Sequence, residues 1–270
     1  MQVPELSEGF THMEIIRTFS DANNLLMKIG CKIDVIEENH DHIIKFPKTR
    51  HLYNLGSVQR DDLMVGSNEL DNFLNQTLYL EEKIDGANLG ISIKDYKLVA
   101  QNRSHYVNSS YHSQFKCLDK WLIDHSQDLW EILQDENKIL YGEWVYAKHS
   151  INYTELPDYF IAFDLWDKIE QRFYSRPRLE SLLSKTSIKI IPLIHTGSFE
   201  SINDLIKYVK TKSAFCSGQV EGVYIRCCDT NNMWLKYRAK IVRSDFLCGN
   251  DHWSKNIQQV NGLINNSFIR

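Results

Sequence analysis

The sequence predicts an α+β protein built mainly from antiparallel sheets. Several apolar segments alternate with a period of two, which is typical of strands that bury one face. Few helical segments are available to connect parallel strands, so neighbouring strands are expected to pair in antiparallel fashion. The chain has 270 residues, 43% hydrophobic and 24% charged, which is the composition of a globular protein with a substantial core.

Residues 1–75 are predicted to form a small N-terminal α+β module. Apolar residues recur at helical spacing up to Gly30, which stands where a helix C-cap is expected. Short strands are predicted at 32–37 and 42–46. In the segment 47–77, proline and glycine residues interrupt any long element.

A basic cluster at residues 45–50 lies inside this module. It contains two lysines and one arginine in a predicted loop. A loop of this kind can bind phosphates or can be a solvated connector. The sequence does not decide between these two interpretations.

Residues 76–270 are predicted to form the second domain, which holds most of the strands. Aromatic and β-branched residues dominate its apolar segments. The predicted strands are 78–80, 89–93, 97–101, 139–147, 159–167, 188–194, 220–227 and 233–238, and the predicted helices are 115–133, 178–184 and 201–210. The 30 residues after Lys240 leave room for a helix or two.

Charge and composition exclude several classes of protein. The net charge of −4 argues against a chain that coats nucleic acid without specificity. No apolar run approaches the roughly 20 residues of a membrane helix, and the N-terminus has no signal peptide pattern. The six cysteines show no C-x-x-C pair. We therefore expect a cytoplasmic or nuclear protein without a membrane partner, and a monomer.

A lysine motif follows the predicted strand 78–80. Its sequence is Glu82-Lys83-Ile84-Asp85-Gly86, a K-x-D-G pattern. A lysine amine becomes a nucleophile only when its surroundings remove its proton, and nearby cations favour that loss by lowering the pKa. On its own the pattern also fits a strand that ends in a hairpin turn with a solvated lysine.

Five downstream segments, read together with this motif, favour the nucleophile. They resemble the ordered motifs of the covalent nucleotidyltransferase superfamily of polynucleotide ligases and RNA capping enzymes. The closest resemblance is to ATP-dependent RNA ligases of the RNA ligase 2 type, over about residues 80–240. The segments are Gln101–Ser104, Gly142–Trp144, Phe160–Asp164, Val220–Arg226 and Trp234–Arg238.

The resemblance implies a role for each matching residue. Lys83 would take up AMP from ATP, and Asn88 would help to place RNA ends. Arg103 and Glu143 would contact the ribose, and Phe163 would stack on adenine. Glu82, beside the lysine, is expected to belong to the nucleotide-binding set.

The resemblance also implies a metal and a phosphate site. Glu221 would bind the catalytic metal, Mg²⁺ or Mn²⁺, and Asp85 would orient the lysine or bind a metal through water. A metal would also explain a carboxylate in an apolar strand, because an unpaired buried charge is costly. Two lysines spaced K-x-K usually hold the α-phosphate; here Lys236 is kept and Arg238 replaces the second lysine, with Lys240 as a possible substitute.

We therefore expect an antiparallel, ATP-grasp-like nucleotidyltransferase domain with no C-terminal OB domain. The expected activity is that of an ATP-dependent RNA ligase, which joins 5′-phosphate and 3′-hydroxyl RNA ends through a lysyl-AMP intermediate. Residues 1–75 would supply further RNA contacts. The alternatives are a capping-type or DNA-joining transferase, and an inactive protein that binds nucleotides or RNA ends.

Overall fold

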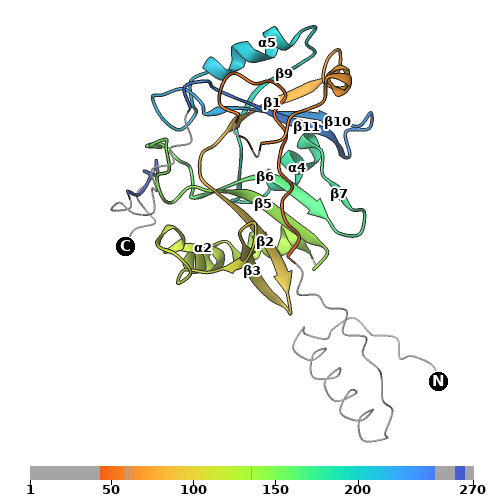
Figure 1. Ribbon diagram of the computed structural model, residues 1–270. Coiled ribbons are helices and arrows are strands. Elements are labelled where there is room, and N and C mark those ends of the chain that lie inside the picture. The colour runs from red at the N-terminus through yellow and green to blue at the C-terminus, as the bar shows by residue number, and fades with distance from the viewer. Residues whose placement is uncertain (1–42, 59, 61, 135, 247–258, 265–270) are drawn as a thin grey trace, which may run out of the picture. The chain divides into compact units, whose positions relative to one another are not determined.

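The computed structural model describes residues 43–58, 60, 62–134, 136–246 and 259–264. Two sheets face each other and carry most of the core (Figure 1). The predicted helix before Gly30, the predicted strand 32–37 and most of the chain after residue 246 lie outside the described residues. The 75/76 domain boundary therefore stays a prediction.

The first sheet has four antiparallel strands in the order β11-β10-β1-β9. These are β1 (Leu78–Lys83), β9 (Leu193–Gly197), β10 (Gly222–Cys228) and β11 (Leu235–Val242). Its outer face is apolar and packs against α5 (Ile202–Ile206), η3 (Lys207–Lys210) and η1 (Ser67–Asn72). Alternation along β1 buries Leu78 and Leu80 on this face and turns the intervening residues toward the second sheet.

The second sheet has seven strands in the order β4-β3-β2-β5-β6-β7, with β8 paired to β6. All of its pairings are antiparallel except that of β6 with β8. The strands are β2 (Ala87–Lys94), β3 (Lys97–Gln101), β4 (Tyr106–Val107), β5 (Lys138–Trp144), β6 (Phe160–Asp167), β7 (Arg172–Phe173) and β8 (Lys189–Ile190). The predicted α+β class, with mainly antiparallel sheets, is confirmed for the described residues.

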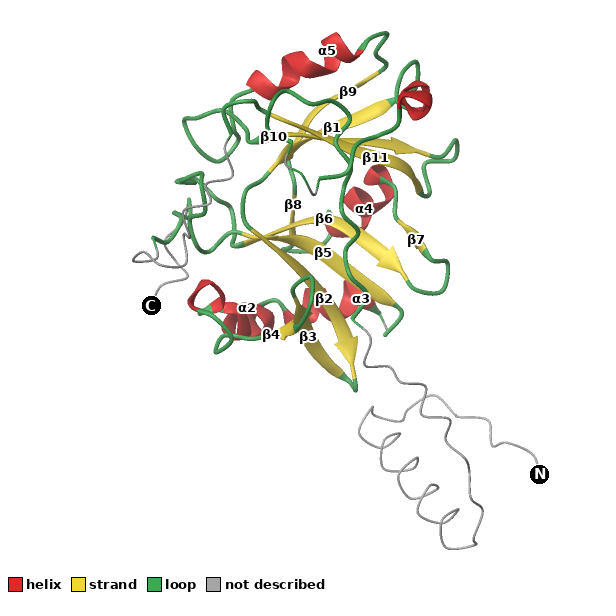
Figure 2. Ribbon diagram, in the orientation of Figure 1, coloured by secondary structure: helices red, strands yellow, loops and turns green. Residues whose placement is uncertain are grey.

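Helices cover the far side of the second sheet (Figure 2). They are η2 (Ser113–Phe115), α2 (Leu118–Asp124) and α3 (Ser126–Leu133), and α4 (Arg176–Leu183) packs near β6 and β8. Leu129, Ile132 and Leu133 are fully buried against this sheet. Within the described ranges, none of the helices combines the length and the apolar character that a bilayer crossing requires.

Tertiary contacts divide the predicted helix 115–133. Its two halves, α2 and α3, are separated by His125. The His125 ring is buried, its Nδ1 is 2.9 Å from Ser187 Oγ, and its Nε2 is 3.2 Å from Asp158. Apolar periodicity continues through such a break, which is why the sequence predicted one helix.

Proline explains a second difference. The predicted strand 188–194 is two strands in two different sheets, β8 and β9, with Pro192 between them. Proline has no backbone N–H to donate, so it stands where the chain leaves one sheet for the other. The predicted strand 42–46 is also wrong where it is described, because residues 43–46 have no regular secondary structure and pair with neither sheet.

A close approach between β10 and β11 requires Gly222. A Cβ atom at this position would lie 2.3 Å from the carbonyl oxygen of Ile241.

We expect Gly222→Ala to lower the free energy of unfolding by about 1–3 kcal/mol, since the backbone must shift. Gly218→Ala is the control, because its Cβ would meet only Cys216 Sγ, at 3.6 Å. Chemical denaturation that gives equal loss for both variants would contradict this reading.

Candidate active site

Lys83 ends β1 and faces a carboxylate on the neighbouring strand. Its Nζ lies 2.6 Å from the carboxylate of Glu221, the residue before β10, and β1 pairs with β10 so that Lys83 stands opposite Gly222. The Lys83 side chain is 24% exposed and that of Glu221 is 5% exposed. A short, largely buried ion pair therefore holds the amine in place.

The surroundings of Lys83 keep the amine protonated. Burial lowers its pKa, but the negative charge of Glu221, the hydrogen bond to that carboxylate and the charge of Asp85 contribute to a net rise above the pKa of a free lysine. The expectation that neighbouring cations would lower this pKa is therefore not met in the chain without ligands. An amine that is protonated and paired with Glu221 is not free to act as a nucleophile.

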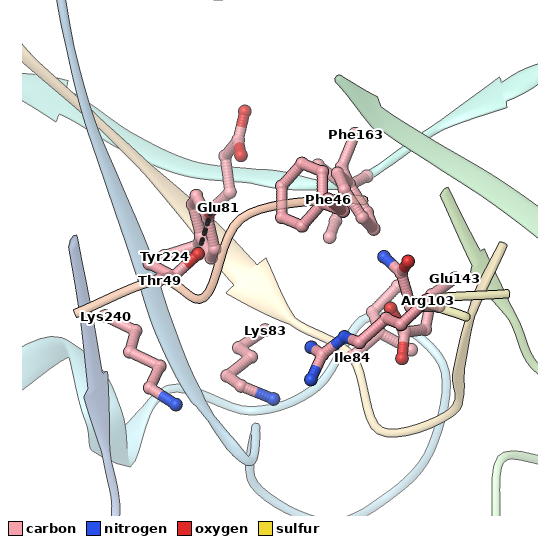
Figure 3. A pocket seen from close by; sticks show the side chains of 12 residues that line it. Phe46, Thr49, Glu81, Lys83, Ile84, Arg103, Glu143, Phe163, Tyr224 and Lys240 are labelled. Carbon is pink, nitrogen blue, oxygen red and sulfur yellow. Dashed lines mark hydrogen bonds between the residues drawn. The ribbon is translucent and has the colours of Figure 1, made fainter. Parts of the chain in front are cut away.

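A pocket between the two sheets contains most of the predicted nucleotide-binding residues (Figure 3). Both sheets contribute, as do the turn after β1, the loop after β3 and the segment before His51. The pocket brings together five residues that the sequence predicted. They are Lys83, Asn88, Arg103, Glu143 and Phe163.

Glu143 lines the pocket from β5, opposite Asn88 on β2. Burial is the main reason that its pKa is raised to about 8, and the charge of Glu221 adds to the effect against the opposing influence of Lys83. Near neutral pH the group is therefore largely a neutral carboxylic acid. It can donate a hydrogen bond as well as accept one.

The opposite end of the pocket is aromatic. Phe163 on β6 makes an edge contact with Phe46, whose ring centroid is 5.1 Å away, and Ile191 and Tyr224 line the same pocket. Glu81, two residues before Lys83 on β1, reaches the pocket wall from the same face of the strand. The pocket thus runs from an apolar end to a charged end at Lys83.

The structure does not bring Lys236 into this pocket. Lys236 is exposed, and its Nζ lies over the ring of Tyr237 at 5.2 Å. Lys240, four residues further along β11, lines the pocket instead. Burial and the charge of Lys83 both lower the pKa of Lys240, as expected of two ammonium groups that share one site.

Glu82 and Asp85 have other partners. Glu82 points to the opposite face of β1, where its carboxylate accepts hydrogen bonds from Ser213 Oγ at 2.5 Å and from the Ala214 amide at 2.9 Å. One carboxylate oxygen of Asp85 accepts the amides of Ser150 and Ile151 at 2.7 and 2.9 Å. Both residues therefore anchor loops around the motif.

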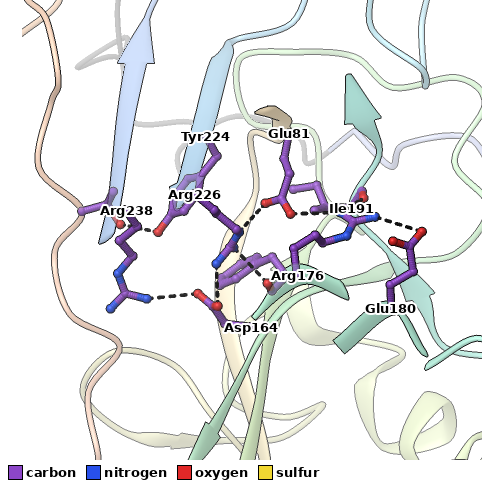
Figure 4. A network of polar contacts seen from close by, with 10 residues as sticks. Glu81, Asp164, Arg176, Glu180, Ile191, Tyr224, Arg226 and Arg238 are labelled. Atoms are coloured by element: carbon purple, nitrogen blue, oxygen red, sulfur yellow. Dashed lines mark hydrogen bonds and ion pairs between the residues drawn. The ribbon is translucent and has the colours of Figure 1, made fainter. Parts of the chain in front are cut away.

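Arg238 belongs to a buried network of charges behind the pocket (Figure 4). Its guanidinium lies 3.1 Å from Asp164, which also binds Arg226 at 2.6 Å. Arg226 and Arg176 in turn bind the two oxygens of Glu81, at 2.6 and 2.9 Å. The network links the first sheet to β6 of the second sheet, where Arg226 also donates to the carbonyl oxygen of Phe163.

A segment that we call the strap, residues 43–52, crosses beside the pocket. Phe46 and Thr49 line the pocket from it, and Thr49 Oγ1 is 2.6 Å from the Tyr224 hydroxyl. Sequence reasoning missed the strap residues, Glu81 and Tyr224 as parts of the site. Strand alternation around Lys83 could have indicated Glu81, whereas the only signal in the strap was its basic cluster, which indicates possible phosphate contacts and not a pocket wall formed by Phe46 and Thr49.

Comparison with known proteins gives the family. Residues 76–242 match the family model for RNA ligase, and this match covers more than half of the chain. The chain therefore belongs to the RNA ligase family. A sequence search among curated proteins finds no match.

Solved structures of RNA ligases share the fold. An RNA ligase from Naegleria gruberi with PPi superposes with a TM-score of 0.56 and 17% identity over 76% of this chain. A mutant of that ligase with ATP and Mn gives a TM-score of 0.56 and 15% identity, also over 76% of this chain. The chain covers only 57% of the length of either structure.

The central arginine of the charge network, Arg226, and the arginine at its edge, Arg238, should differ in their contribution to the free energy of unfolding. Arg226→Met leaves the carboxylates of Glu81 and Asp164 short of a partner in the interior, so we expect a loss of about 3–5 kcal/mol in unfolding free energy. Arg238→Met should cost less, because its side chain is 14% exposed and Asp164 keeps Arg226. Equal losses in urea denaturation would show that the network is not organised around Arg226.

The raised pKa of Glu143 predicts a pH-dependent stability. The folded state holds this proton more tightly than the unfolded chain, so its contribution is complete below about pH 4.5 and is lost as the pH rises through about 8. The unfolding free energy of the wild type should therefore fall relative to Glu143→Gln over this window, by at most a few kcal/mol. Exposed Glu131→Gln controls for the loss of one charge. A difference that stays constant from pH 5 to pH 9 would refute the shift.

Proposed function

We propose that the chain is an ATP-dependent RNA ligase that joins a 5′-phosphate to a 3′-hydroxyl through a lysyl-AMP intermediate. The observation that supports this most is the placement of Lys83. Its amine stands at the charged end of a pocket that ends in aromatic rings and contains Arg103, Glu143 and Lys240. The family shown by the sequence supports the reaction class.

The pocket fits an adenine nucleotide in one orientation. Phe163 and the neighbouring apolar groups suit the base, and Arg103 with the neutral Glu143 suits the ribose hydroxyls. Lys240 then lies on the phosphate side, beside Lys83. Substrate positioning and neutralisation of phosphate charge are the main protein contributions to phosphoryl chemistry.

The first step forms a bond between Lys83 Nζ and the α-phosphorus of ATP. The bond from the α-phosphorus to the bridging oxygen breaks, and pyrophosphate leaves with the electron pair. The ammonium must first release a proton to solvent, which requires that the pairing with Glu221 be weakened. Lys240 favours this release, because a second cation nearby lowers the pKa of an amine.

A divalent metal fits the charges at this end of the pocket. Within the described part of the chain, no three histidine, cysteine, aspartate or glutamate side chains group closely enough to hold an ion by themselves. Mg²⁺ does not need such a cage, because it binds through one or two carboxylates, phosphates and water. Glu221, whose pKa is raised by burial, would hold it, and the ion would neutralise phosphate charge and compete with Lys83 for this carboxylate.

In the later steps AMP passes to RNA and is then released. An oxygen of the RNA 5′-phosphate forms a bond to the AMP phosphorus as the phosphorus–nitrogen bond breaks, and Lys83 regains a proton. The 3′-hydroxyl oxygen then forms a bond to the RNA 5′-phosphorus and loses its proton to solvent. The bond from this phosphorus to the bridging oxygen breaks, and AMP leaves with the electron pair. A groove adjoins the pocket and shares Asn88, Arg103 and Glu143 with it. Its other polar residues can form hydrogen bonds with RNA ends; they are Asn102, Ser104, His105 and Gln114.

The replacement of lysine by Arg238 no longer favours an inactive protein. Arg238 stabilises Asp164 and stacks over the rings of Phe46 and Phe173, at 4.6 and 4.2 Å. Lys240 leaves the chain with an ammonium group on the phosphate side. Arg238 therefore acts in this proposal as a structural residue, and Lys240 takes the place that the sequence first assigned to Lys236.

Three lysine variants test the proposal with labelled ATP. Lys83→Ala should abolish the covalent protein–AMP adduct, because it removes the amine. Lys240→Ala should slow adduct formation by about 10²-fold, the order expected for losing one charged group that stabilises a transition state. Lys236→Ala should stay within about threefold of the wild type. Equal effects at Lys236 and Lys240, or an adduct in Lys83→Ala, would reject the assignment.

A further inference from the structure

We propose that the outer side of the strap is a binding site for the phosphates of the RNA strand whose end enters the pocket, with Lys45 and Lys48 as its ligands. This inference rests on the proposed function, since it concerns the RNA substrate of the same site. It gives a role to the basic cluster at 45–50, which the sequence left open. It assigns two of the RNA contacts that the sequence predicts for residues 1–75.

The strap is fixed at both ends by hydrogen bonds. At its start, the carbonyl oxygen of Ile44 accepts the Tyr141 hydroxyl at 2.6 Å and Gln101 Nε2 at 2.8 Å. At its end, the Lys240 amide donates to Arg50 at 3.0 Å and the Lys240 carbonyl accepts from Leu52 at 2.8 Å. The end of the strap therefore continues the sheet beside the lysine that we place on the phosphate side.

Inward and outward residues follow each other along the strap with a period of three. Phe46 is 7% exposed and Thr49 is partly buried, and both line the pocket. Lys45 and Lys48 are exposed. The same pattern places Lys45 and Lys48 together on the side of the strap that does not line the pocket.

The third basic residue of the cluster, Arg50, is less exposed than the two lysines and forms an ion pair. Arg50 binds Glu69 through both guanidinium nitrogens, at 2.5 and 3.0 Å, and thereby ties the strap to η1. Lys45 and Lys48 are the exposed basic residues of the strap. Exposed lysines on a fixed backbone suit phosphates, because an ammonium group contacts them as a point charge without reading the base.

The reaction requires RNA close to this position. The RNA 5′-phosphate must reach the α-phosphorus bound near Lys83 and Lys240, and Lys240 is hydrogen-bonded to the strap. The overall charge of −4 repels a polyanion, so local cations beside the pocket have to supply the attraction. The strap would provide them where the strand leaves the pocket.

The test compares two charge-reversed pairs in the full chain. The strap variant is Lys45→Glu with Lys48→Glu. The control is Lys207→Glu with Lys210→Glu, which has the same spacing and charge change on exposed residues of η3, over the far face of the first sheet. The conservative variant, Lys45→Arg with Lys48→Arg, keeps both positive charges and should bind RNA as the wild type does.

Three measurements are made on each variant: binding of a 5′-phosphorylated single-stranded RNA at several salt concentrations, sealing of pre-adenylylated RNA, and adduct formation from ATP. We expect the strap variant to bind RNA about tenfold more weakly than the control. The slope of log affinity against log salt should become shallower by about 1 to 1.5, since each single-strand phosphate contact contributes about 0.7. The loss in sealing should exceed any loss in adduct formation at least fivefold.

Other outcomes reject the proposal in distinct ways. Equal RNA binding by both pairs would show that the strap lysines are a solvated surface. A loss confined to adduct formation would assign them to the phosphate tail of ATP. Failure of the wild type to form an adduct would reject the proposed function, whereas the RNA-binding comparison would still decide whether the strap contacts RNA.

Discussion

The site depends on the ion pair between Lys83 and Glu221. Antiparallel pairing of β1 with β10 brings together two residues that are 138 positions apart, and burial of both charges makes each necessary to the other. The pair holds the amine in position but also keeps it protonated. In the proposed reaction, ATP and a cation would have to redistribute these charges before Lys83 could react.

A second set of buried charges holds the two sheets together around the pocket. Glu81 and Asp164 lie on opposite sheets, and Arg226 contacts both of them. The same arginine donates to the carbonyl of Phe163, so the residue proposed to stack on adenine is tied through Arg226 and Glu81 to the strand that carries Lys83. Because β1 alternates, Glu81 and Lys83 face the pocket together while Glu82 anchors a loop behind it. Geometry at both ends of the pocket therefore depends on one strand.

Much of this site could be predicted from the sequence, because motif order and strand character are local properties. Asn88, Arg103 and Phe163 reach the pocket as expected. Lys236 and Lys240 could not be separated by spacing alone, since the register of the β10–β11 hairpin, with Tyr224 opposite Lys240, decides which lysine lies beside Lys83. The strap and the break at His125 depend on partners distant in sequence, which no local pattern encodes.

The central claim is that Lys83 itself becomes the carrier of AMP. Peptide mapping by mass spectrometry, after incubation of the intact chain with ATP and Mg²⁺ or Mn²⁺, tests it most directly. We expect AMP on the peptide that contains Lys83, in an acid-labile linkage of phosphorus to nitrogen. This AMP should be released when RNA with a 5′-phosphate is added. AMP attached to another residue, or bound ATP without any covalent adduct, would contradict it.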